Sequence, residues 1–147
     1  DGMRLISVVM GTSSDEARAQ ESQKLLSYGF RFYETMKLYE RGAVLATPRV
    51  WGGDTNELRV GVDEEVFMTL PRNRNEELRA RLNLDADLQA PVAVGDNVGT
   101  LEVYLGEEMV GERQLVALEN IEEGGLFKRL FDQVQRFFSN LISNFTS

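Results

Sequence analysis

The chain has 147 residues, the size of one ordinary domain or of two small ones. Its net charge is −8, and such an acidic chain lacks the clustered Lys and Arg that nucleic-acid binding requires. It contains no Cys and no His, which excludes disulfides, thiolate zinc sites, cysteine nucleophiles, Ser-His-Asp triads and His-ligated metals. We therefore expect no metal, no cofactor and no nucleic-acid partner.

The first residues predict half of a hairpin. Asp1-Gly2 is a strong signal for a two-residue turn, and residues 3–10 are apolar and β-branched, which is typical of a strand. A hairpin needs a strand on each side of its turn, and the upstream strand is missing here. We therefore expect the sequence to be part of a longer protein; the alternative is that Asp1-Gly2 is not native to it.

A helix is predicted to follow this strand. Ser13 and Glu16 have the spacing of a capping box, and residues 17–26 are rich in helix formers. The tripeptide at residues 28–30 predicts the end of the helix. One strand and one helix have too little apolar surface to fold alone.

Residues 36–119 show the pattern of an all-β region. Apolar residues dominate or alternate with polar ones in five segments, at residues 58–62, 66–70, 78–82, 101–105 and 114–118. Turn signals between them recur about every 8–12 residues, which predicts a small antiparallel sandwich or barrel. The alternating Arg and Glu residues favour a solvated sheet face over a ligand site.

Trp51, the only tryptophan, is expected to be a buried core anchor, and the alternative is an exposed recognition aromatic.

The tail predicts an amphipathic helix after a flexible break at Gly124-Gly125. Three basic residues and one acidic residue give residues 126–147 a net charge of +2. We expect a membrane-surface anchor, since the polar face runs the full length and no run of about 18 apolar residues is present for a spanning helix. The alternative is a helix docked on the domain core or in a bundle. The predicted membrane-binding residues are Leu126, Phe127, Leu130, Phe131, Val134, Phe137, Phe138, Leu141, Ile142 and Phe145, with Lys128, Arg129 and Arg136.

Several segments resemble one family closely. They are MRLISVVMG at residues 3–11, KLLSYGFRFYET at 24–35, TPRVW at 47–51, TLPR at 69–72, AP at 90–91, VGT at 98–100, LVAL at 115–118 and EGG at 123–125. The chain is similar in these segments to the low-molecular-mass penicillin-binding proteins, which are serine-type D-alanyl-D-alanine carboxypeptidases, and most of all to the penicillin-binding protein 5 and 6 group of Gram-negative bacteria. The resemblance covers the whole chain.

The resemblance implies a mainly β fold and a division into three parts. Residues 1–35 would be the last strand and helix of an α/β transpeptidase-like catalytic domain, residues 36–123 a β-sandwich domain, and residues 124–147 the amphipathic anchor. The implied partners are an upstream catalytic domain of the same polypeptide, an anionic membrane surface and, through the parent enzyme, the peptidoglycan pentapeptide. The implied location is the periplasmic face of the inner membrane.

The motifs that carry the family's chemistry are absent from the sequence. No Ser-x-x-Lys, Ser-x-Asn or Lys-Thr-Gly occurs, and Ser22-Gln23-Lys24 is one residue short of the first. Acyl-enzyme chemistry needs an activated nucleophile. We therefore expect no catalytic residue in this chain and no activity from the chain alone.

One residue is a candidate for substrate contact in the intact enzyme. The family pattern Asp-x-x-Arg-x-x-Glu falls on Asp15, Arg18 and Glu21. The resemblance implies that Arg18 helps to bind the terminal D-alanine carboxylate, which suits an arginine near a helix start. The alternative is a surface arginine paired with Asp15 or Glu21.

Two functions from different classes fit the sequence. The first is the non-catalytic stalk and membrane anchor of a carboxypeptidase that trims the last D-alanine from peptidoglycan stem peptides. The second is a stand-alone protein–protein interaction module with the tail as a partner-binding helix. Residues 1–33 are expected to be poorly held or domain-swapped, because the opening strand has lost its hairpin partner.

Overall fold

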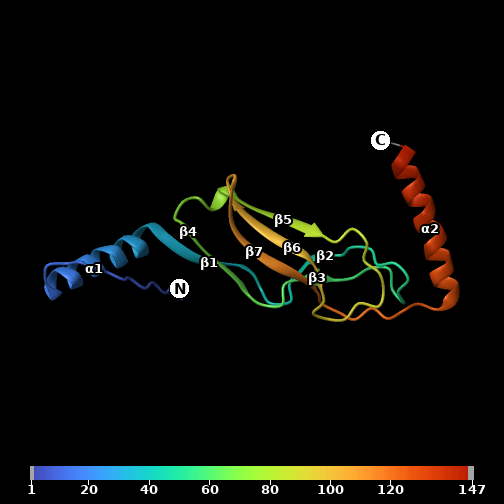
Figure 1. Ribbon diagram of the computed structural model, residues 1–147, viewed down its shortest axis with the longest axis horizontal. Helices are drawn as coiled ribbons and strands as arrows, with labels where there is room; N and C mark the ends of the chain where they lie inside the picture. Colours follow the sequence, from blue (N-terminus) through green and yellow to red (C-terminus); the bar gives the residue numbers. More distant parts are fainter. Residues whose placement is uncertain (1, 146–147) are drawn as a thin grey trace.

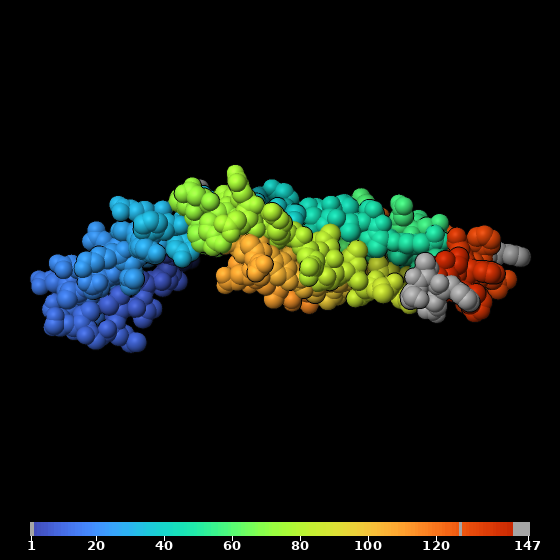
Figure 2. Space-filling view, turned by 90° about the horizontal axis from the view of Figure 1, so that it is seen from above, coloured from blue at the N-terminus to red at the C-terminus, as the bar shows by residue number. Residues whose placement is uncertain are grey.

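The structure, a computed structural model, describes residues 2–145 apart from the side chains of Phe127 and residues 143–145. The predicted turn at Asp1 and the predicted membrane contacts of the Phe127 and Phe145 side chains lie outside the described residues. The described chain is elongated, with a helix at each end and a β-rich body between them (Figure 1). The view from above shows the same order of parts (Figure 2).

Two antiparallel sheets form the body. β1 (Tyr33–Tyr39) pairs with β4 (Val66–Pro71) in a two-stranded sheet. The other sheet has the order β2 (Val44–Ala46), β3 (Val60–Gly61), β7 (Glu108–Ala117), β6 (Asn97–Leu105) and β5 (Leu78–Leu84). A short 3-10 helix, η1 (Asn75–Glu77), leads into β5. The prediction of a mainly β fold with antiparallel sheets and flanking helices is confirmed.

Side-chain alternation places the core on one face of β6. Leu101, Val103 and Leu105 are buried, while the residues between them remain partly exposed. The two sheets meet where Met68 of β4 packs against Gly111 of β7. A Cβ at Gly111 would lie 2.5 Å from the terminal methyl of Met68, so a larger residue there would require the Met68 side chain to shift.

Residues 3–10 do not form the predicted strand. The segment is extended without regular hydrogen bonding, and every second side chain is exposed, among them Ile6, Val8 and Met10. The inward-facing Leu5 lies against Gly29 of the first helix. A strand requires a ladder partner, and none of the described residues supplies one. The strand prediction is therefore wrong for this chain.

The first helix, α1 (Asp15–Phe32), is capped one residue later than predicted and ends later. The Ser14 hydroxyl, not that of Ser13, accepts from the Ala17 N–H at 3.1 Å. The helix passes directly into β1, since Arg72 N–H donates to the Phe32 carbonyl at 2.8 Å and the Thr35 and Thr69 hydroxyls lie 2.7 Å apart. Pairing with β4 thus extends strand structure to residues 33–35, just before residue 36, where the predicted all-β region begins.

Candidate membrane interface

The second helix, α2 (Leu126–Phe145), lies at the end of the body opposite α1 (Figure 1). Its apolar residues recur at three- and four-residue steps, which gives one continuous apolar face. The Gly125 carbonyl accepts from the Lys128 and Arg129 N–H groups at 2.9 and 3.1 Å, which fixes the first turn.

The Gly124-Gly125 pair is not a flexible break. Gly124 is buried, and its N–H donates to the Gly52 carbonyl at 2.8 Å. A Cβ at Gly124 would lie 2.7 Å from the Gly53 carbonyl oxygen, so glycine is needed for this close approach. The prediction from dipeptide composition is wrong because the backbone is held by the adjacent loop of the body.

A carboxylate holds α2 to the body. Asp132 is 5% exposed, and its Oδ2 accepts from the Gly52 N–H at 3.0 Å. The Arg49 guanidinium lies 3.8 Å from Asp132 Oδ1, donates to Gln135 Oε1 at 2.9 Å and stacks 4.1 Å from the centre of the Trp51 ring. The buried charge is thus met by a backbone donor and a cation, as a buried carboxylate requires.

The three basic residues predicted to contact the membrane lie at the boundary between α2 and the body. Lys128 Nζ donates to the Asp54 carbonyl at 2.6 Å, Arg129 pairs with Glu123, and Arg136 pairs with Asp87. These contacts place the polar face of α2 against the body. With 3.6 residues per turn, the apolar residues then point away from it.

The apolar face of α2 is uncovered along the described helix. Leu126 is 82% exposed and Phe131 is 71% exposed, which is unusual for such large apolar groups. The exposed set comprises Leu126, Leu130, Phe131, Val134, Phe137, Phe138, Leu141 and Ile142. Each such side chain gains about 1.5–3 kcal/mol on full transfer out of water, so the face has a large gross driving force for burial.

Sequence reasoning missed Asp132 and misplaced Trp51. Asp132 is the only acidic residue in residues 126–147. An acidic residue is unexpected on a helix predicted to bind anionic lipid, and this could have indicated a different partner for Asp132. Trp51 is half-buried beneath Arg49, not a core anchor. Both residues line a hollow of about 180 Å³ between α2 and the body, together with Gln89 and Arg136.

Arg18 lies on the first turns of α1, far along the chain from α2. Its Nη1 is 3.3 Å from Asp15 Oδ1, and both side chains are largely exposed. Glu21 accepts from Lys24 at 2.7 Å. Within the family pattern Arg18 thus pairs with Asp15, while Glu21 pairs with Lys24 outside the pattern, and the substrate role of Arg18 stays a prediction.

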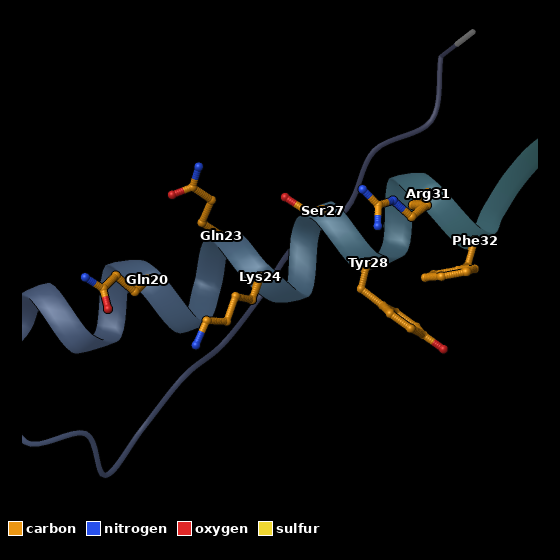
Figure 3. A pocket seen from close by; sticks show the side chains of 7 residues that line it. All are labelled: Gln20, Gln23, Lys24, Ser27, Tyr28, Arg31 and Phe32. Atoms are coloured by element: carbon orange, nitrogen blue, oxygen red, sulfur yellow. The ribbon is translucent and has the colours of Figure 1, made fainter.

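A second hollow, of about 520 Å³, follows one face of α1. Figure 3 shows that its side chains all come from that helix: Gln20, Gln23, Lys24, Ser27, Tyr28, Arg31 and Phe32. The Tyr28 and Phe32 rings pack with centroids 4.6 Å apart. A hollow walled by one helix is an uncovered helix face, not an enclosed catalytic cavity.

The shifted pKa values belong to hydrogen-bonded pairs on the body. Hydrogen bonding to Arg74 lowers the pKa of Glu77, and hydrogen bonding to Lys37 lowers that of Glu40. A hydrogen bond from the Tyr104 hydroxyl to Glu102 raises the pKa of Tyr104. Each shift has a hydrogen bond to a neighbouring side chain as its main cause, and such pairs also occur as structural contacts.

Neither a metal cluster nor a membrane-crossing helix is found in the described part of the chain. No group of three His, Cys, Asp or Glu side chains there is arranged to hold an ion. None of the described helices combines the length and the hydropathy that crossing a bilayer demands.

Sequence comparison decides the family. The sequence model described as "Penicillin-binding protein 5, C-terminal domain" matches residues 33–123. The chain belongs to this family. It is 42% identical over 92% of its length to the D-alanyl-D-alanine carboxypeptidase DacC of Escherichia coli (strain K12), and 39% identical to DacA of the same organism. It covers 34% of each of these relatives, so it spans about a third of their length.

Solved structures give the same result. The fold matches penicillin-binding protein 5 from Haemophilus influenzae with a TM-score of 0.73 and 34% identity, over 78% of this chain and 34% of that one. The D-alanyl-D-alanine carboxypeptidase DacD from Francisella tularensis matches with a TM-score of 0.58 and 28% identity, over 78% of this chain and 29% of that one. The predicted relationship to the penicillin-binding protein 5 and 6 group is confirmed.

Proposed function

We propose that this chain is the membrane-proximal, non-catalytic portion of a D-Ala-D-Ala carboxypeptidase. In this role the β body is a stalk and α2 is a peripheral anchor on the periplasmic face of the inner membrane. The observation that supports the anchor most strongly is the uncovered apolar face of α2, which points away from the body while the polar face is docked.

The geometry favours a helix that lies in the interface. Asp132 and Arg136 are held against the body, so the helix presents only its opposite face to lipid. A face of this kind inserts about 5–10 Å into the boundary between headgroups and acyl chains. The body then stays in water with α1 at its far end.

The relation to the catalytic domain follows from α1 and the segment before it. Ile6, Val8 and Met10 are exposed on one side of the extended segment, and Leu25 and Phe30 are exposed on α1. We propose that an upstream catalytic domain of the same polypeptide covers them. In that enzyme a serine from the upstream domain would cleave the terminal D-Ala-D-Ala bond, and Arg18 would contact the substrate carboxylate.

Vesicle flotation tests the anchor. The chain is mixed with vesicles of phosphatidylcholine and phosphatidylglycerol, and we expect it to float with the lipid. A double variant of α1, Leu25→Asp with Phe30→Asp, should float equally, because α1 is at the other end of the molecule. Failure of the unaltered chain to float would contradict the anchor and would favour a protein–protein interaction module.

The non-catalytic role has its own test. Incubation with penicillin followed by mass spectrometry should show no covalent penicilloyl adduct, because the sequence has no Ser-x-x-Lys. A stoichiometric adduct would contradict this part of the proposal.

A further inference from the structure

We propose that α2 is rigidly latched to the β body, so that membrane binding fixes the orientation of the whole body on the bilayer. The latch consists of Asp132, Arg49, Gly52 and Gly124. This inference rests on the proposed anchor function and adds a positioning role for Asp132. A flexible anchor would restrain only the distance of the body from the bilayer, whereas a latched one also restrains its tilt.

The first step is the cost of undocking. The Asp132 carboxylate is 5% exposed and is satisfied by the Gly52 N–H at 3.0 Å and by Arg49 at 3.8 Å. If the helix swung away, Gly52 would lose its acceptor. Asp132 would lose both its backbone donor and its Arg49 cation. These contacts therefore favour the docked state.

The second step is the connection between helix and body. Gly52 contributes both its N–H, to Asp132, and its carbonyl, to Gly124 at 2.8 Å. Gly52 thus binds the chain at two points, at Gly124 just before α2 and at Asp132 in the second turn of α2. Two attachments along the chain prevent the rotation that a single pivot allows.

The third step is that latching and lipid insertion use different faces. Lys128, Asp132 and Gln135 contact the body, while Leu130 and Phe137 are exposed on the opposite side. The helix can therefore insert without releasing the body. Because α2 runs across the long axis of the body in Figure 1, a flat helix would hold the body upright with α1 far from the lipid.

The experiment measures the spread of distances between helix and body. The chain has no Cys, so one pair of spin labels can be placed at the exposed positions Asp63→Cys on the body and Ser139→Cys on α2. Pulsed electron resonance should give a single narrow distance distribution in solution and the same distribution on phosphatidylcholine–phosphatidylglycerol vesicles. A broad distribution in either state would overturn the latch.

A matched pair of glycine variants provides the control. Gly124→Ala places a Cβ 2.7 Å from the Gly53 carbonyl oxygen, whereas Gly125→Ala meets nothing within 4 Å. We expect the narrow peak to be lost in Gly124→Ala and in Asp132→Ala, and to be kept in Gly125→Ala. Asp132→Asn keeps an oxygen that can accept from Gly52 and should broaden the peak less than Asp132→Ala. Narrow peaks in both Asp132→Ala and Gly124→Ala would overturn the proposal.

Flotation separates the latch from the anchor. The Asp132→Ala and Gly124→Ala variants should still float, because the apolar face is intact. If the unaltered chain does not float but its peak is narrow in solution, the anchor fails and the rigid latch stands. If it floats but its peak is broad, the anchor stands and the latch fails.

Discussion

The two helices both expose large apolar side chains, but they do so in different ways. On α1 the exposed Leu25, Tyr28 and Phe30 are interleaved with charged residues, and the helix continues into β1 without a break. On α2 the apolar residues form one stripe, and the polar residues opposite it are docked on the body. The mixed surface of α1 suits contact with a protein domain, whereas the continuous stripe of α2 suits a bilayer.

The largest expected effect breaks the stripe. Phe131 and Phe138 are seven residues apart and share one face of α2. Replacing both with Asp removes about 3–6 kcal/mol of apolar burial and adds repulsion from anionic lipid, so membrane binding should fall by about 100-fold or more. Flotation measures this, with Leu25→Asp and Phe30→Asp on α1 as the control. Unchanged flotation of the α2 variant would contradict the stripe as the lipid contact.

The basic residues of α2 should matter less than the stripe. Replacing Lys128, Arg129 and Arg136 with Gln removes charge near the lipid, worth at most about 1 kcal/mol per residue. Their contacts with Asp54, Glu123 and Asp87 reduce this further, since each charge already has a polar partner. Flotation should weaken only for anionic vesicles. If this variant loses all binding while the Phe pair has no effect, the helix is an electrostatic tether.

The extended segment before α1 provides a contrast with the core of the body. Residues 5–10 have no ladder partner among the described residues, whereas β6 and β7 pair over their full lengths. Hydrogen exchange in a dilute monomer should therefore be fast over residues 5–10 and slow over β6 and β7. Strong protection of residues 5–10 in the monomer would contradict this. Protection that arises only in a dimer would indicate domain swapping.

The smallest expected effect concerns the Arg74–Glu77 ion pair at η1 on the body. Hydrogen bonding to Arg74 lowers the pKa of Glu77 below its ordinary 4.5. Glu77 thus stabilises the fold fully above pH 4.5, and this contribution is lost as the pH falls through its lower folded pKa. Thermal melting at about pH 6 and about pH 3 should show a slightly larger loss for the unaltered chain than for Glu77→Gln, because exposed pairs contribute little. Equal losses would show that the pair contributes nothing.

The spacing of apolar residues in the sequence predicted those strands and helices that have a regular local periodicity. The alternation around Leu101 and Leu115 identified β6 and β7, and the helical steps of the tail identified α2. β1 was not among the predicted strands; it forms by pairing with β4, which lies farther along the chain. The strand at residues 3–10 was wrong because a strand depends on a partner that sequence pattern alone does not supply.

The docking of α2 depended on tertiary contacts that the sequence does not show. Periodicity separates the two faces of the helix but does not say which face meets the body. Gly124 was interpreted as flexible because glycine is common in linkers, yet here its small size permits a close backbone contact with the loop at residues 52–53. Asp132 was counted only as a charge, although its burial makes it the main polar attachment of α2.

Depth-dependent fluorescence quenching by brominated lipids tests most directly the claim that the stripe meets lipid while the body stands off. Trp51 is the only tryptophan and lies beside α2 on the body. A Phe138→Trp variant in a Trp51→Phe background places the only fluorophore on the stripe. Bound to vesicles, the variant should be strongly quenched and the unaltered chain weakly quenched. Strong quenching of Trp51 together with weak quenching at position 138 would contradict the docked anchor.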